Sequence, residues 1–142
     1  MIYKHTQFGG WLIFLPVGIA VLFTGIWGII TSEIPALILS VLFIIILALF
    51  YRLTVMIDEA CLRVVYGIGL IRFKFSIKEI KSSRPVKNSW WYGWGIRYTP
   101  HGWLFNIAGL QAVEFTLKDN RTFRIGTDEP EELCRALNRL SA

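Results

Sequence analysis

Side chains that could act in catalysis are few in this sequence and stand far apart. The histidines His5 and His101 are distant from each other, and no group of His, Cys, Asp and Glu has the spacing of metal ligands. The pair Ser82-Ser83 lacks the flanking glycines of a nucleophile elbow. The Gly67-x-Gly69 pattern precedes a strand-like segment rather than a helix, so it does not predict a phosphate-binding loop. We therefore expect no enzyme, no cofactor and no metal ion.

A basic and aromatic stretch between residues 78 and 103 is the strongest candidate for a binding site. Cations beside aromatic rings suit an anionic membrane surface, where the rings lie at headgroup depth. An alternative stays open, in which some of the tryptophans fill the core of a small β domain and the cations form its wet face. Single-stranded nucleic acid uses the same chemistry, but a membrane tether argues against it, so we expect no nucleic acid. The candidate lipid-contact residues are Lys78, Lys81, Arg84, Lys87, Trp90, Trp91, Trp94 and Arg97.

The tether is predicted from two long apolar runs in the first third of the chain. Residues 6–32 carry no formal charge, and residues 34–51 carry none either. About 20 apolar residues suffice to cross a bilayer as a helix. We predict a membrane hairpin over residues 1–52, with helices at about 8–31 and 34–52. The second run is marginal in length unless Tyr51 and Arg52 lie at the interface. A cleaved signal peptide and a buried amphipathic helix fit less well, because the runs are too long and show no polar face.

The placement of charge predicts the orientation of this hairpin. The connection between the runs carries Glu33 alone, whereas Lys4 precedes the first run and Arg52 follows the second. Lys and Arg concentrate on the cytoplasmic side of membrane proteins. We therefore expect a multi-pass protein of the plasma membrane with both termini in the cytoplasm.

Small residues and a proline predict how the two helices are built. Pro16 lies inside the first run, and a helix starting there would be too short to span, so we expect it to begin earlier and kink. Gly18 and Gly25, with Ala36 and Ser40 opposite, are expected to form the seam, since small residues let helices approach closely in lipid.

After residue 52 the apolar period changes from helical to strand-like. Strands are predicted at 53–58, 61–66, 71–77 and 80–86, and the third of these alternates strictly between apolar and basic residues. Cys61 and Cys134 are isolated and are interpreted as small buried hydrophobes in a reducing compartment.

A hairpin near the C-terminus can be predicted down to its register. A three-residue loop, residues 118–120, pairs Phe115 with Phe123 and places Glu114 opposite Arg124 as an exposed ion pair. It also puts Asn120 at the left-handed position. A closing helix is predicted at about 130–141, because Pro130 suits its first turn and an apolar stripe follows.

Several motifs of residues 53–142 resemble the bacterial pleckstrin-homology-like domains of small membrane proteins. The motifs are residues 53–58, 93–97, 109–114 and, most specifically, 124–133. The resemblance implies a mainly β domain of about seven antiparallel strands in a sandwich or partly open barrel, capped by the C-terminal helix. It implies no catalytic residues and no general ligand.

From these features we expect a non-enzymatic interaction or assembly module displayed at the cytoplasmic membrane surface. The expected partners are the lipid bilayer and another membrane protein or a second copy of the chain. Binding of an anionic lipid or headgroup by residues 78–103 is the alternative function.

Overall fold

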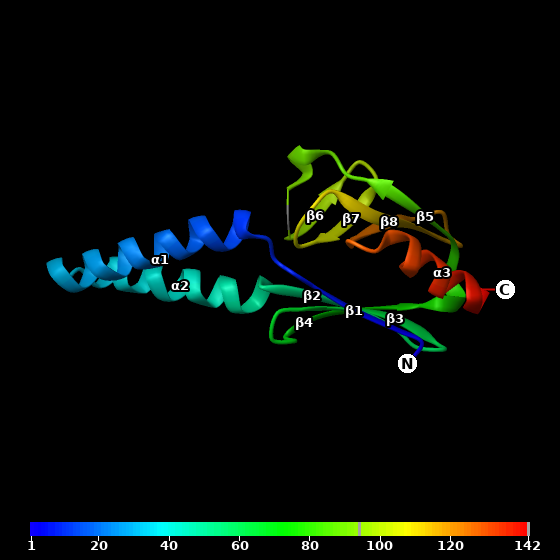
Figure 1. Cartoon of the computed structure of the whole chain (residues 1–142), viewed down its shortest axis with the longest axis horizontal. Helices are drawn as coiled ribbons and strands as arrows, with labels where there is room; N and C mark the ends of the chain where they lie inside the picture. The colour runs from blue at the N-terminus through cyan, green and yellow to red at the C-terminus, as the bar shows by residue number, and fades with distance from the viewer. Residues whose placement is uncertain (94, 142) are drawn as a thin grey trace.

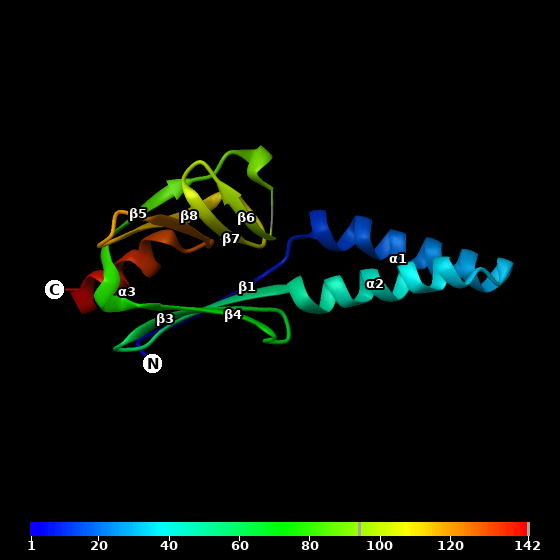
Figure 2. The same ribbon diagram turned by 180° about the vertical axis from the view of Figure 1, so that it is seen from behind.

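A computed structural model describes residues 1–93 and 95–141 as a helical hairpin that projects from one end of a β sandwich (Figures 1 and 2). Both chain ends lie at the opposite end of the sandwich from the helices (Figure 1). The elements in chain order are β1 (Tyr3–Phe8), α1 (Trp11–Thr31), α2 (Ile34–Phe50), β2 (Arg52–Ile57), β3 (Cys61–Tyr66), β4 (Ile71–Ser76), η1 (Ile77–Glu79), β5 (Ile80–Lys87), η2 (Trp90–Tyr92), β6 (Gly95–Thr99), β7 (Gly102–Asn106), β8 (Gln111–Leu117), β9 (Thr122–Gly126) and α3 (Pro130–Ser141).

The two apolar helices lie side by side and are joined by a tight turn. Among the described residues, one helical segment is long and apolar enough to cross a membrane, Ile13–Thr31 of α1. The apolar α2 is shorter, with 17 residues. Of the expected multi-pass hairpin, the described residues thus show one helix with the length and composition of a span, and a second crossing is not shown. Helix α1 runs from Trp11 through Pro16, so it begins before the proline as expected, but three residues later than predicted.

Close contact between α1 and α2 depends on small residues, although not on all those predicted. The buried Ser40 donates a hydrogen bond to the Val21 carbonyl at 3.2 Å, and a Cβ on Gly25 would lie 3.3 Å from its hydroxyl oxygen. A Cβ on Gly28 would lie 2.8 Å from two Leu37 carbons. Gly18 has no neighbour within 4 Å of such a Cβ in the described chain, so its predicted place in the seam is wrong.

The first ten residues are not a lead into the membrane but contain a strand of the sandwich. Strand β1 pairs antiparallel with β2, with His5 opposite Val55 and Phe8 opposite Arg52. The Gly9 N–H continues the pairing by donating to the Tyr51 carbonyl at 2.8 Å. The assignment of residues 3–8 to the membrane hairpin is thus wrong, because they form a strand of the sandwich and the helices are inserted into the connection between β1 and β2.

Within the described residues, the strands form a four-stranded sheet, β1-β2-β3-β4, and a five-stranded sheet, β5-β8-β9-β7-β6. All pairs are antiparallel except β7 with β9, so the expectation of about seven antiparallel strands holds only for the general architecture. The core lies between the sheets, where Phe75 and Phe123 stack at 4.2 Å. Helix α3 packs its buried Leu133 and Leu137 against this core, as predicted.

The β8–β9 hairpin has the predicted register. Phe115 pairs with Phe123, Glu114 pairs with Arg124, and Asn120 has a φ of 66°. The ion pair, however, is buried rather than exposed, with 5% of Glu114 and 6% of Arg124 accessible. The prediction failed because β5 lies beside β8 and brings Arg84 and the buried Asn88 onto the same face.

Candidate membrane-facing site

The end of the sandwich next to the helices carries exposed apolar side chains from several loops. We call them the hairpin-side rim. Trp90 and Trp91 in η2 are 73% and 68% exposed, and η2 is the yellow-green turn above β6 in Figure 1. Six residues make up the rim: Phe8, Trp11, Ile68, Leu70, Trp90 and Trp91. Large exposed apolar side chains at one end of a domain make that end a candidate for a protein or membrane interaction surface.

The turn between β3 and β4 contacts the end of α2 and is hydrogen-bonded to it. The Ile68 N–H donates to the Ala48 carbonyl at 3.2 Å, and the Gly67 N–H donates to the Arg52 carbonyl at 2.8 Å. Arg52 Nε in turn donates to the Gly67 carbonyl at 3.0 Å. Gly67 has a φ of 51°, and a Cβ there would lie 2.3 Å from the Ala48 and Leu49 carbonyl oxygens. A glycine is therefore required where the turn meets the helix.

A second turn, which carries Trp90 and Trp91, is anchored at its base by a buried asparagine. The Asn88 N–H donates to the Leu110 carbonyl at 2.7 Å, and Asn88 Oδ1 accepts a hydrogen bond from Arg124 Nη1 at 3.2 Å. The two indole rings meet edge to face at 5.9 Å. The base of the turn is thus hydrogen-bonded to the sheet, while Trp90 and Trp91 at its tip are exposed.

The predicted lipid-contact cations do not gather around these tryptophans. Lys78 in η1 and Lys81 in β5 lie toward the other end of the sandwich, beside α3 (Figure 1). Arg84 is engaged with Glu114, and Lys87 ends β5 close to η2. Arg97, on β6, lines a cavity at the hairpin end. Trp94 lies outside the described residues.

Arg84, Glu114 and Arg124 belong to a row of side chains that crosses the five-stranded sheet. Register pairs join Arg84 to Glu114, Glu114 to Arg124, Arg124 to Leu104, and Leu104 to Arg97. Glu114 Oε1 accepts from Arg84 Nε, and Oε2 from Arg124 Nε, each at 2.9 Å. Burial acts to raise the pKa of Glu114, but the hydrogen bonds and charges of the two arginines outweigh it and hold the pKa below its ordinary value. Within this row, Arg84, Glu114 and Arg124 therefore form a structural cluster in which the buried carboxylate is paired.

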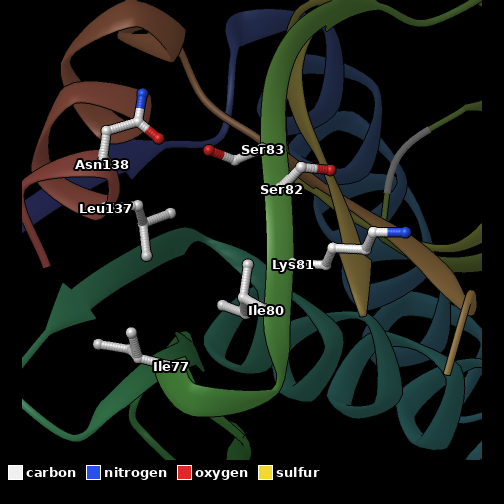
Figure 3. A pocket seen from close by; sticks show the side chains of 7 residues that line it. All are labelled: Ile77, Ile80, Lys81, Ser82, Ser83, Leu137 and Asn138. Atoms are coloured by element: carbon white, nitrogen blue, oxygen red, sulfur yellow. The ribbon is translucent and has the colours of Figure 1, made fainter. Parts of the chain in front are cut away.

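A small cavity of about 170 Å³ beside α3 contains hydroxyls but no catalytic arrangement (Figure 3). Ser83 points its hydroxyl toward α3, whereas the Lys81 amine extends on the other side of the strand (Figure 3). Burial raises the pKa of the neighbouring Cys134, although a hydrogen bond with Ser83 opposes the shift, so the thiolate is disfavoured. No group of metal-ligating side chains occurs among the described residues.

Comparison of the chain with family models, with curated proteins and with solved structures finds no match. The pleckstrin-homology-like resemblance therefore stays an expectation from the sequence motifs.

Sequence reasoning missed half of the hairpin-side rim. Ile68 and Leu70 are exposed apolar residues in a glycine-rich turn. In the sequence they alternate with Gly67 and Gly69, a pattern that predicts a turn and thereby places them outside a strand. The helix predicted at about 8–31 includes Phe8, whereas its place at the end of β1 depends on the pairing with β2.

Proposed function

We propose that this chain is an integral membrane protein whose helical hairpin crosses the cytoplasmic membrane and holds the β sandwich on its inner surface. In this proposal the sandwich is a non-enzymatic interaction module of pleckstrin-homology-like type. The observation that carries the proposal is the insertion of the apolar hairpin into the β1–β2 connection, where Gly9 pairs with Tyr51 and Gly67 contacts α2. Because no flexible linker separates β1 from α1 or α2 from β2, the module has a defined height and orientation above the bilayer.

The lengths of the two helices support a hairpin that spans. With a rise of about 1.5 Å per residue, α1 extends for about 32 Å and α2 for about 26 Å. The shorter α2 is continued by Tyr51 and Arg52, and Arg52 places its guanidinium outside the helix, against Gly67. Such an interfacial tyrosine and arginine compensate for a few missing apolar residues.

Site-directed labelling in intact cells tests this topology. A Glu33→Cys variant introduces a thiol in the α1–α2 turn, and a Lys118→Cys variant introduces one in the β8–β9 loop. The native Cys61 and Cys134 are buried and give little background. A membrane-impermeant maleimide should label the Glu33→Cys variant in intact cells and the Lys118→Cys variant after permeabilisation alone. Labelling of both variants from the same side would overturn the spanning hairpin.

Contact of the hairpin-side rim with lipid is a second function, favoured by the exposure of Trp90 and Trp91. Indole rings prefer the headgroup region of a bilayer, where the ring is partly desolvated and its N–H stays hydrated. The rim lies around the root of the hairpin, which is where the bilayer surface would be (Figure 1). The interaction module would then be docked on the membrane through the rim while its other surfaces remain available to a partner.

Fluorescence quenching of the full chain in nanodiscs with brominated phospholipids tests the rim. Replacing Trp90 and Trp91 by Phe should lower the fraction of emission that bromine quenches. Trp103→Phe is the matched control, because Trp103 is half exposed on β7 but lies outside the rim. Its replacement should raise the quenched fraction. If both changes have the same effect, the rim does not contact lipid.

A further inference from the structure

A cavity of about 600 Å³ lies at the junction between the helical hairpin and the five-stranded sheet. Its helical wall comes from the first turn of α1 and the last turns of α2, and its other wall from β6 and the residues after β7. We call it the junction cavity. The residues that matter here are Ile13, Ile46, Phe50, Ile96, Arg97 and Ile107.

We propose that the junction cavity binds one phospholipid of the surrounding bilayer, with an acyl chain between the apolar walls and an anionic headgroup phosphate at Arg97. This inference rests on the proposed function, because it needs the hairpin to be in the membrane.

The lining of the junction cavity favours an acyl chain. Of the nine described residues that line it, five carry large apolar side chains, two are glycines, and two, Arg97 and Asn106, are polar. The volume falls within the range of roughly 300–1,000 Å³ that is typical of small-molecule sites. Water gains little in an apolar space of this kind, whereas burial of hydrocarbon does not require hydrogen-bond partners.

The position of the junction cavity selects a bilayer lipid as the source of that chain. Ile13 is the first residue of the span Ile13–Thr31, and Phe50 is the last residue of α2. Both therefore lie at the end of the hairpin where hydrocarbon gives way to headgroups. A lipid can enter sideways from this level without leaving the membrane.

The polar edge of the junction cavity is suited to a phosphate. No acidic side chain lines the cavity among the residues that the structure describes. Asn106 also lines the cavity, where its Oδ1 accepts from the Ile107 N–H and its Nδ2 donates to the Gly109 carbonyl. Arg97 lies against Gly93, where a Cβ would come within 3.1 Å of its Nε. The glycine thus makes room for a guanidinium, which is the side-chain group best matched to a phosphate.

Native mass spectrometry of the full chain tests the proposal. The chain is reconstituted in vesicles of mixed phosphatidylcholine and phosphatidylglycerol and released into mild detergent. The wild type should retain one phospholipid, enriched in phosphatidylglycerol. An Ile96→Trp variant fills the cavity and should lower retention at least tenfold. An Ile2→Trp variant adds the same ring at the opposite end of the sandwich, away from the cavity and the rim, and should retain the lipid as the wild type does.

The headgroup contact is tested separately by Arg97→Gln, which should keep a lipid bound but reduce its preference for phosphatidylglycerol about fivefold. Lys74→Gln removes an exposed cation of β4 and is the matched control. An unchanged preference in Arg97→Gln would overturn the assignment of the phosphate to Arg97.

A second variant, Ile46→Trp, fills the junction cavity from α2. It can replace Ile96→Trp in the lipid-retention experiment if Ile96→Trp fails to fold. Undiminished retention in whichever folded filling variant is obtained would overturn the cavity as the binding site. Labelling of the Glu33→Cys variant identifies which proposal has failed. A hairpin that spans but retains no lipid contradicts this inference alone, whereas a hairpin that does not span contradicts the proposed function.

Discussion

The helical hairpin and the β sandwich place their apolar side chains in opposite environments. In the span of α1 only 6% of residues are buried within the protein, and large side chains such as Phe23 and Ile30 are exposed. In the sandwich, apolar residues such as Leu62 and Phe115 are fully buried. The difference supports the proposal that the hairpin lies in lipid, since exposed apolar side chains are stable in an apolar environment.

The two regions nevertheless share one continuous backbone ladder. Strands β1 and β2 pair up to the residues that enter α1 and leave α2, so an antiparallel strand pair becomes an antiparallel helix pair. The joint is completed by the Gly67 turn against α2. Variants of the hairpin, the sandwich and the joint should therefore have separable effects.

Removal of the hairpin should have the largest effect. Replacing residues 10–50 by Asn-Gly closes the Gly9–Tyr51 pair with the two-residue turn that antiparallel strands prefer. The shortened chain should move from the membrane to the soluble fraction and keep its sandwich, as measured by fractionation and by amide NMR spectra.

A fragment of residues 52–142 provides the comparison for this variant, because it lacks β1 as well as the helices. Its free energy of unfolding should be lower than that of the Asn-Gly variant by about 3 kcal/mol, since β1 covers the edge of β2 and packs Tyr3 on the core. Equal stability of the two proteins in guanidinium denaturation would show that β1 is dispensable for the sandwich.

Within the sandwich, Glu114→Gln should have the next largest effect. The change leaves the buried Arg124 without its carboxylate partner and should lower the free energy of unfolding by about 3–5 kcal/mol. Guanidinium denaturation of the full chain in micelles, followed by near-UV circular dichroism, measures it. Arg84→Gln removes the exposed partner of the same carboxylate and should cost less than about 1 kcal/mol. Equal losses would contradict the burial of the Glu114–Arg124 pair.

The same pair should make the stability of the sandwich depend on pH. Because folding lowers the pKa of Glu114, its contribution is present above the ordinary value of 4.5 and is lost as the pH falls further, through the folded value. The Glu114→Gln variant should lack this part of the acid transition. An identical acid transition in both proteins would show that other carboxyl groups cause it.

At the joint, Gly67→Ala should cost about 3 kcal/mol, because a Cβ there meets the carbonyls of α2 and the backbone is left-handed. Gly69→Ala is the matched control in the same turn. It has a φ of 96°, but a Cβ there meets side-chain atoms no closer than 3.8 Å, so its loss should be nearer to 1 kcal/mol. Thermal unfolding of the full chain in nanodiscs distinguishes the two, and similar losses would argue against a tight joint.

The smallest effect is expected within the hairpin. Gly28→Ala brings a Cβ against Leu37 and should destabilise the helix pair by about 1–2 kcal/mol. Gly18→Ala meets open space within the described chain and should be neutral or slightly stabilising. Helicity in graded SDS measures both changes. A larger loss from Gly18→Ala would place a further helix on that face.

Features that depend on short-range patterns could be predicted from the sequence. The β8–β9 register follows from the alternation of Val113, Phe115, Phe123 and Ile125, because a slip of one residue would turn every side chain to the wrong face. Helix α3 follows from Pro130 and the apolar stripe behind it, and the apolar helices follow from their length and lack of charge.

Features that depend on contacts between distant segments could not be predicted from the sequence. The strand character of residues 3–8 requires β2, which stands beyond both helices, and the burial of Glu114 requires β5 and Asn88. The candidate lipid-contact stretch was one run of residues in the sequence, but β5 carries its cations along the length of the sandwich while η2 holds its tryptophans at one end. Periodicity and composition determine which segments are apolar and which form strands or helices. The neighbours of each segment depend on how the sheets pair and close. The contacts that bury Glu114 and Arg124 show this, since Arg84 and Asn88 come from 30 or more positions away in the chain.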